Sequence, residues 1–265
     1  MQEQITRRVS KIGNGAHIFV PKKWINEEIV LVRTVKQDIK ERILELLAPY
    51  LEDIIGVFLY GSYARNEQIK DSDVDILIIS NKNFKIEKKD DFEIIILEED
   101  KINKAIKINP LLVYSILNEA KPIINSNLLE ELKEKYKPKI KDFKEMIEDT
   151  KRLVKINKEF LDLEEEKYTD DKATVYSLIL RLRGIYLINL LLDGKSYNYN
   201  DFKKWVQSNT QLKDYDSIYK AYLSIKREIK LKQKILVLDL NNLLKLLEKE
   251  TLKLEGKYGK KKKTS

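Results

Sequence analysis

Asp73 and Asp75 stand two positions apart at the start of a short apolar run, DVDILII. In a strand, side chains alternate between the two faces, so both carboxylates lie on one face while Val74 lies on the other. Two like charges this close repel each other unless a cation lies between them. Oxygen ligands that leave coordination positions free for phosphate suit Mg²⁺. The spacing therefore predicts a hard-metal site where this strand begins.

A glycine and a serine precede the aspartate pair, with ten residues between them. Gly61 and Ser62 follow the run 54–60, IIGVFLY, whose β-branched and aromatic residues predict a buried strand. Such a strand end lets backbone amides and a hydroxyl approach a phosphate, especially if a helix follows. Arg65 could neutralise further phosphate charge. A plain turn with a capping serine is the alternative, but it leaves Asp75 unexplained inside an apolar strand.

The stretch GSYARNEQIKDSDVDIL resembles the polymerase β-type nucleotidyltransferase superfamily, and most of all its minimal nucleotidyltransferase branch. The resemblance implies transfer of a nucleoside monophosphate, with AMP from ATP expected, to a hydroxyl on a protein, an RNA or a small molecule. It implies two Mg²⁺ ions held by Asp73 and Asp75. It also implies nucleotide contacts from four residues, namely Gly61, Ser62, Arg65 and Ser72.

The same superfamily places a third carboxylate on the next strand. Here Glu93 is the acid inside the predicted strand 92–97, FEIIIL, and the resemblance makes it a metal ligand and catalytic residue. The family position more often holds Asp, and Glu reaches further, which puts the geometry of the second metal in question. Asp91, at the strand entrance, is the fallback ligand. Alternatively, Glu93 is a surface residue of an edge strand.

The remaining patterns predict where helices and strands lie around this motif. Apolar spacings of three and four indicate a helix over 35–50, and the strands over 54–60, 74–79 and 92–97 follow it. Further helices are predicted over 111–118, 139–166, 172–192, 199–208, 214–229 and 237–254, with a brief extended piece at 122–124.

These elements indicate an α+β protein built from four segments. The predicted segments are a β-hairpin unit over 1–34, a small mixed-sheet nucleotidyltransferase domain over 35–127, an all-α helical domain over 128–254, and a basic disordered tail over 255–265.

The helical segment carries aromatic and arginine side chains at helical spacing. They could stack on a base and pair with phosphate, although aromatic residues at such spacing are more often core and arginines more often pair with neighbouring acids. The set comprises Tyr176, Arg181, Arg183, Tyr186, Tyr219, Tyr222 and Arg227. We expect this domain to cover the active site and select the acceptor.

The N-terminal residues predict two short strands around Gly-Asn-Gly and a third near 29–32. An isolated hairpin is marginally stable in water, so this unit needs a partner. The segment resembles the AbrB-like swapped-hairpin family, in which two copies interlock and basic residues often hold DNA. That resemblance implies a homodimer or docking element, with DNA contacts from Arg7, Arg8, Lys11, Lys22 and Lys23 as the alternative role. His17 lacks the companions of a metal ligand and is expected to be structural.

Composition excludes several classes of site and protein. There is no cysteine, which excludes disulfides and thiolate chemistry, and the single histidine leaves carboxylates, lysines, arginines, hydroxyls or a hard metal for catalysis. Neither a signal peptide nor a membrane span is indicated, and the expected compartment is the cytoplasm. The formal net charge of +8 concentrates at the two ends, with eight basic against four acidic residues in 1–40 and six lysines against one glutamate in 251–265. A DNA-binding regulator whose nucleotidyltransferase fold only senses nucleotide is therefore the second functional hypothesis.

Overall fold

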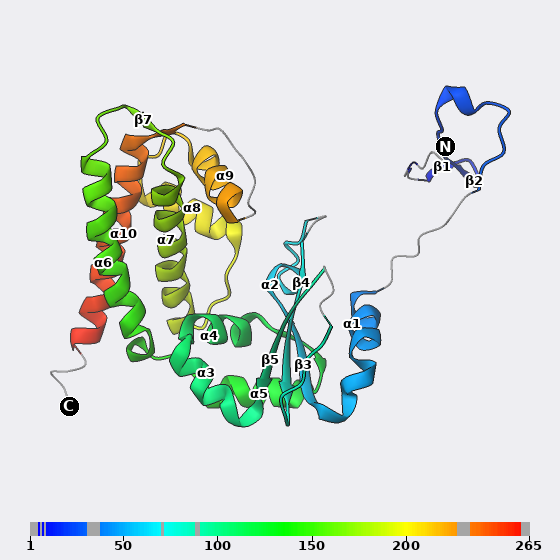
Figure 1. Ribbon diagram of the computed structural model, residues 1–265, viewed down its shortest axis with the longest axis horizontal. Coiled ribbons are helices and arrows are strands. Elements are labelled where there is room, and N and C mark those ends of the chain that lie inside the picture. Colours follow the sequence, from blue (N-terminus) through cyan, green and yellow to red (C-terminus); the bar gives the residue numbers. More distant parts are fainter. Residues whose placement is uncertain are drawn as a thin grey trace. The chain divides into compact units, whose positions relative to one another are not determined.

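The computed structural model describes residues 5, 7, 9–30, 38–69, 72–87, 91–226 and 234–260, with the backbone alone for 258–260. The chain forms two compact units, residues 1–47 and residues 48–265 (Figure 1). Each unit is described by itself.

The smaller unit contains the predicted hairpin. β1 (Ser10–Ile12) pairs antiparallel with β2 (Gly15–His17), and the turn between them places Gly13 at a φ of 52°. A 3₁₀ turn (Lys22–Trp24) and α1 (Ile39–Leu47) follow. A third strand was expected near 29–32. Residues 29 and 30 are described and do not form a strand, and residues 31–32 lie outside the described part. Val30 is 90% exposed, and among the described residues no strand pairs with this segment to satisfy its backbone.

The larger unit begins with a mixed sheet after a 3₁₀ turn (Ala48–Asp53). Its strands are β3 (Ile54–Tyr60), β4 (Val74–Ser80), β5 (Phe92–Glu98) and β6 (Lys121–Ile124), in the spatial order β5-β4-β3-β6. β4 and β5 run parallel, whereas the other pairs are antiparallel. The three strands predicted from apolar runs are confirmed to within one residue, and the extended piece at 122–124 completes the sheet.

Short helices accompany this sheet. They are α2 (Gly61–Ala64), α3 (Ile102–Ile108), α4 (Pro110–Glu119) and α5 (Ser126–Lys135), with a 3₁₀ turn (Glu99–Lys101) before α3. α3 packs against β5 and α5 against β3. α3 was not expected from the sequence, because in seven residues only Ile102 and Ile106 mark its buried side. Asn109 caps α4 by accepting a hydrogen bond from the Leu112 amide at 3.2 Å.

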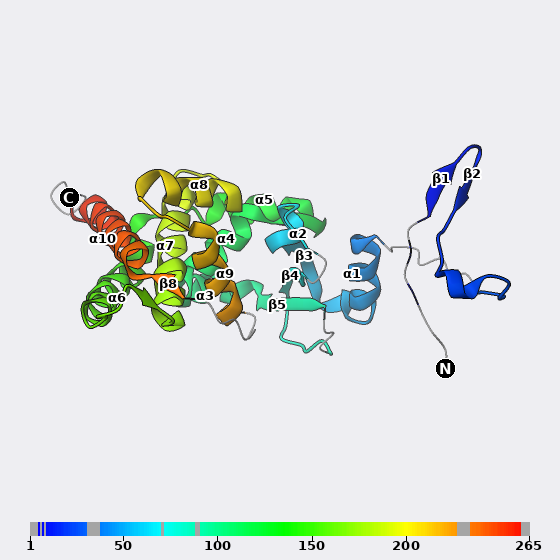
Figure 2. The same cartoon turned by 90° about the horizontal axis from the view of Figure 1, so that it is seen from above.

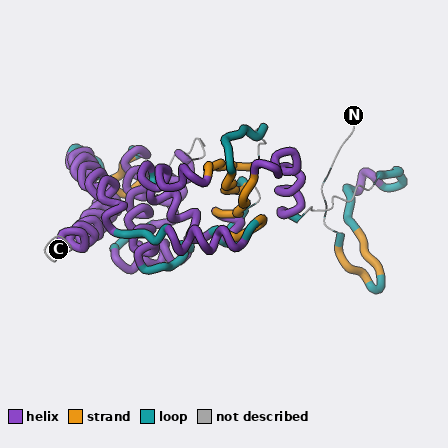
Figure 3. Tube along the Cα trace, turned by 90° about the horizontal axis from the view of Figure 1, so that it is seen from below, coloured by secondary structure: helices purple, strands orange, loops and turns teal. Residues whose placement is uncertain are grey.

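The rest of the larger unit is helical. It comprises a 3₁₀ turn (Ile140–Phe143), α6 (Lys144–Asp162), α7 (Lys172–Leu192), α8 (Tyr199–Asn209), α9 (Tyr215–Lys226) and α10 (Val237–Lys260), with β7 (Tyr168–Thr169) pairing with β8 (Ile235–Leu236). Figures 1 and 2 place α4 between the sheet and α7. Figure 3 shows the sheet strands and the long helices at opposite ends of this unit.

The predicted helices are present, with corrections at two ends: the helix predicted over 139–166 ends at Asp162, and the last helix is longer than predicted. α7 has the predicted bounds, whereas α10 continues to Lys260, so residues 255–260 are helical rather than part of a tail. The physical reason is tertiary packing, since Leu254 is fully buried and Glu255 forms a 2.5 Å ion pair with Lys151 of α6. Residues 227–229 and 261–265 lie outside the described part.

α7 is the central helix of the helical part. By length and composition it could cross a membrane, with a mean hydropathy of 1.6. It packs instead against α4, α6, α9 and α10, and Leu178, Leu182 and Ile185 are fully buried there. Its apolarity on several faces is that of a buried core helix.

Candidate active site

The carboxylates of the motif gather at one edge of the sheet. Asp75 of β4 lies opposite Tyr60 of β3 on one side and opposite Glu93 of β5 on the other. Paired residues on neighbouring strands share a face, so these three side chains form one row across the sheet. Asp73 precedes β4 by one residue and is exposed, as is Glu93, while Asp75 is half-buried.

This row concentrates negative charge. Burial, with the neighbouring charges of Glu93, Asp73 and Glu119, raises the pKa of Asp75 to about 6, against a lowering effect of Arg65. Burial and three of the same carboxylates also raise the pKa of Tyr60. Sites of this kind favour a bound cation or a bound proton.

The donor set fits Mg²⁺, because every candidate ligand is a carboxylate oxygen. Among the described residues, no three acidic or imidazole side chains already converge into a complete metal centre. Mutual repulsion keeps like charges apart when no cation neutralises them.

Gly61 occupies a position that only glycine fits. Its φ is 69°, in the left-handed region, and it opens the single turn of α2 directly after β3. A Cβ at this position would collide with the Asp75 carboxylate. The missing side chain thus lets the turn and β4 approach each other. Ser62 follows at the next position of this turn and is half-buried.

Glu119 holds this turn from the opposite side. It is the last residue of α4, and its Oε1 accepts a 2.9 Å hydrogen bond from the Gly61 amide while Oε2 accepts one from Arg65 Nη1 at 2.6 Å. Our sequence analysis did not single out this residue. It lies 58 residues beyond Gly61 and no local pattern marks it; only the packing of α4 against α2 brings the two together.

Arg65 and Ser72, both expected to contact nucleotide, have protein partners here. Arg65 Nε donates to Glu67 Oε2 at 2.9 Å, so the guanidinium joins two carboxylates. The Ser72 hydroxyl accepts a hydrogen bond from the Ile69 amide at 2.9 Å, closing the loop ahead of Asp73. A direct role of either side chain in nucleotide binding stays a prediction.

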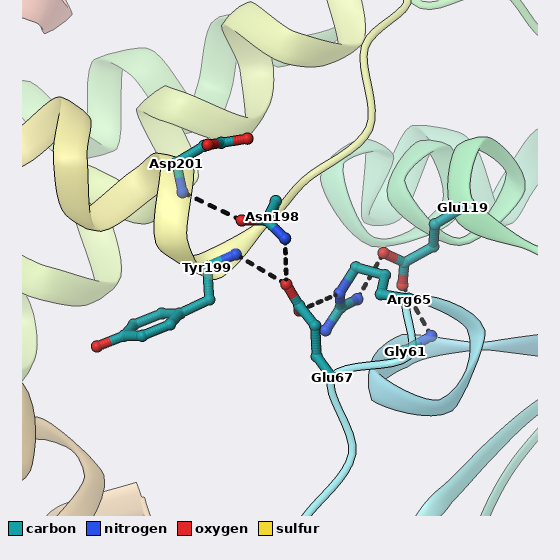
Figure 4. Close-up of polar contacts among 7 residues, drawn as sticks. All are labelled: Gly61, Arg65, Glu67, Glu119, Asn198, Tyr199 and Asp201. Carbon is teal, nitrogen blue, oxygen red and sulfur yellow. Dashed lines mark hydrogen bonds and ion pairs between the residues drawn. The ribbon is translucent and has the colours of Figure 1, made fainter.

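The helical part reaches the motif through Glu67. Its Oε1 accepts hydrogen bonds from Asn198 Nδ2 at 2.8 Å and from the Tyr199 amide at 3.0 Å, at the beginning of α8 (Figure 4). Glu67 is part of the motif GSYARNE, yet its partners lie more than 130 residues away and had no sequence signal.

The aromatic ring of Tyr197 contacts two arginines where the helical part meets the motif. The Tyr197 ring centre is 5.5 Å from Arg65 Cζ and 5.0 Å from Arg183 Cζ. Burial raises the pKa of Tyr197 to about 12, and Arg183 partly offsets this. Arg183 Nε is buried without a hydrogen-bond partner, and among the described residues no carboxylate pairs with this side chain.

The other side chains of the predicted aromatic set behave mostly as core. Tyr222 is 2% exposed and stacks on Tyr176, while Tyr186 and Tyr219 pack within neighbouring aromatic clusters. Arg181 forms a 2.9 Å ion pair with Asp149. Arg227 lies outside the described residues.

The basic residues of the N-terminal hairpin lie in the smaller unit. Lys11 lies on β1, and Lys22 and Lys23 lie on the 3₁₀ turn; these three and Arg7 are exposed, while Arg8 lies outside the described residues. His17 packs edge-on against Phe19 at 4.7 Å.

Comparison with known proteins gives a family match. Residues 32–175, more than half of the chain, match the nucleotidyltransferase domain family. A search of curated proteins found no match. Among solved structures, the spectinomycin adenyltransferase AAD(9) from Enterococcus faecialis, determined with ATP and spectinomycin, shares 14% identity over 80% of this chain and 97% of that one, at a TM-score of 0.42. A nucleotidyltransferase-like protein from Exiguobacterium sibiricum 255-15 shares 13% identity over 83% of this chain and 78% of that one, at a TM-score of 0.36.

Proposed function

Because the chain belongs to the nucleotidyltransferase domain family, we propose that it transfers a nucleoside monophosphate, with ATP as the donor, to an acceptor hydroxyl in the cytoplasm. The observation that carries this proposal is the row of Asp75 and Glu93 beside Gly61. It joins a cation-attracting carboxylate group to a glycine turn that approaches it closely. In the reaction, the acceptor oxygen forms a bond to the α-phosphorus, and the bond to the bridging oxygen breaks to release pyrophosphate.

The proposed roles follow from position. Asp73 and Asp75 would hold Mg²⁺ toward the triphosphate, and Glu93 would hold Mg²⁺ toward the acceptor hydroxyl. Mg²⁺ held there would offset the charge that develops on the attacking and leaving oxygens. Ser62 donates its hydroxyl to a phosphate oxygen. Gly61 lets the turn approach Asp75 closely, and its amide donates to Glu119.

The helical part would select the acceptor, since Tyr197 and the beginning of α8 lie beside the motif. A protein hydroxyl, an RNA 3′ end and a small molecule are the three acceptor classes to be distinguished. Substrate positioning and charge neutralisation then supply most of the catalysis.

The direct test incubates the purified protein and native cell extract with Mg²⁺ and each α-³²P-labelled nucleoside triphosphate. We expect label transfer from ATP that EDTA abolishes, and the labelled species identifies the acceptor class. Binding of ATP without transfer from any nucleotide would favour the nucleotide-sensing regulator instead.

We further propose that Arg183 pairs with the triphosphate. The Arg183 side chain is half-buried and hydrogen-bonds Tyr222, but its buried Nε has no hydrogen-bond partner, and a phosphate oxygen would supply one. We expect Arg183→Met to weaken ATP binding about tenfold, in the range of a lost charge-assisted hydrogen bond. Isothermal titration with ATP measures this. Arg181→Met, two residues away on α7 but paired with Asp149, is the matched control and should bind ATP normally. Equal affinities of the two variants would contradict the assignment.

A second function is favoured by the apolar surface of the smaller unit. Its side chains Val9, Ile12, Phe19 and Ile25 are between 59% and 74% exposed. A hairpin with so little buried surface is marginal by itself. We propose that a second copy of the chain covers it, and that the exposed Arg7, Lys11, Lys22 and Lys23, with Arg8, then contact DNA phosphates.

Deleting residues 1–34 tests both parts of this second proposal. Light scattering should show a dimer for the full chain and a monomer for the deletion variant. Duplex DNA should bind more tightly to the full chain at low salt. An unchanged mass would contradict the dimer, and unchanged DNA retention would contradict the DNA contact.

A further inference from the structure

Glu67 is the point at which the helical part contacts the phosphate-binding turn. Its carboxylate is 21% exposed and accepts hydrogen bonds from Arg65, Asn198 and the Tyr199 amide. In Figure 4 it lies between Arg65 on one side and the beginning of α8 on the other. None of the roles proposed above uses this residue.

The contacts form a continuous path to the Gly61 turn. Glu67 holds the Nε edge of the Arg65 guanidinium at 2.9 Å, and Glu119 holds Nη1 at 2.6 Å. The second oxygen of Glu119 accepts the Gly61 amide at 2.9 Å. Charge-assisted hydrogen bonds of this kind fix geometry as well as adding energy. A displacement of the Glu67 side chain is therefore transmitted to the Gly61 turn through two side chains, those of Arg65 and Glu119.

The helical end of the path is built to receive a carboxylate. Asn198 Oδ1 accepts the Asp201 amide at 3.1 Å, which directs Nδ2 toward Glu67. The Tyr199 amide is one of the donors at the beginning of α8 that have no partner within the helix. The helix dipole adds to the preference for negative charge there. A neutral glutamine would keep one acceptor but lose the charge that both ends of the path require.

We infer that Glu67 is a positioning residue, through which the helical part fixes Arg65 and the Gly61 turn in the geometry for transfer. This inference rests on the proposed nucleotidyl transfer. The Glu67 carboxylate contacts none of the candidate metal ligands, whereas the Glu67 amide donates to the Ser62 carbonyl at 2.9 Å and so also joins this residue to the turn. Its loss should therefore slow the transfer step more than it weakens nucleotide binding, because misplacement of reacting groups lowers kcat. A purely structural cap of α8 would affect stability without affecting the turn.

Hydrogen exchange on the full chain tests this path without depending on activity. The variants are Glu67→Gln and Asn198→Ala, and the readout is amide exchange in the peptide covering residues 61–67. We expect exchange to accelerate about tenfold in both variants, the range of one lost charge-assisted contact. Asn209→Ala is the control, because Asn209 lies at the other end of α8 and donates only to the Trp205 carbonyl. Unchanged exchange in Glu67→Gln would overturn the inference.

Steady-state kinetics provide the second readout. We expect kcat to fall about tenfold in Glu67→Gln while KM for ATP changes less than about threefold, and the effects of Glu67→Gln and Asn198→Ala to be non-additive, since both remove one network. Normal kcat in Glu67→Gln, with transfer intact in the wild type, would overturn the inference alone. Absence of transfer in the wild type would overturn the proposed function, and the exchange measurement would then show whether the path itself exists.

Discussion

Asp75→Asn should lower nucleotidyl transfer by on the order of 10³-fold, because it removes the central carboxylate of the proposed metal site. Asp75 is half-buried, whereas Asp73 and Glu93 are exposed. It also lies between two neighbouring strands, opposite Tyr60 of β3 and Glu93 of β5. An amide keeps the size and one acceptor oxygen but lacks the charge that attracts the ion. Label transfer from α-³²P-ATP measures the effect, and Asp73→Asn should give a loss of the same kind. Activity within tenfold of the wild type would exclude Asp75 as a ligand.

The same substitution should not destabilise the metal-free protein. The pKa of Asp75 is raised to about 6 in the folded state, so the folded protein holds this proton more tightly than the unfolded chain does. Ionised Asp75 therefore disfavours the folded state above about pH 6, and this disadvantage disappears as the pH falls through 6 toward the ordinary value of 3.8. In EDTA at pH 7.5, Asp75→Asn should melt at or above the wild-type temperature, and the difference should shrink at pH 5. A lower Tm would contradict this account of the site.

Gly61→Ala should reduce transfer by about 10²-fold, because small displacements of reacting groups have effects of this size. The added methyl group would collide with the Asp75 carboxylate, and the alanine backbone would have to adopt a φ of 69°. Either the Gly61 turn or β4 must move. The same label-transfer assay, with Tm as the measure of folding, records the effect.

Gly194→Ala is the matched control for this substitution. Gly194 has a φ of 65°, but a Cβ there meets nothing within 4 Å. It therefore carries the backbone strain of about 1–2 kcal/mol without the collision. Its stability should fall while transfer stays near the wild-type rate. Equal activity in the two alanine variants would show that the close approach of Gly61 to Asp75 has no part in the reaction.

Much of the fold follows from local patterns in the chain. The strands at 54–60, 74–80 and 92–98 are short apolar runs with clear ends, and α7 is a continuous helical pattern, so each could be predicted with accurate bounds. The predictions fail where contacts between residues far apart in the sequence determine the secondary structure. α3 has too few apolar positions to mark it, the strand expected near 29–32 lacks a partner in the described part, and α10 continues past Leu254 because α6 pairs with its end.

The candidate site divides in the same way. The sequence by itself determined the nucleotidyltransferase motif, because its glycine, serine and acidic residues lie within one strand-turn-strand segment and the alternation of a strand places Asp73 and Asp75 together. Tertiary structure alone decided that Glu119 holds the Gly61 amide and that Asn198 meets Glu67. These partners lie 58 and 131 residues from the motif residues that they contact. No local period or spacing records such pairs, since helix packing creates them only after the chain has folded.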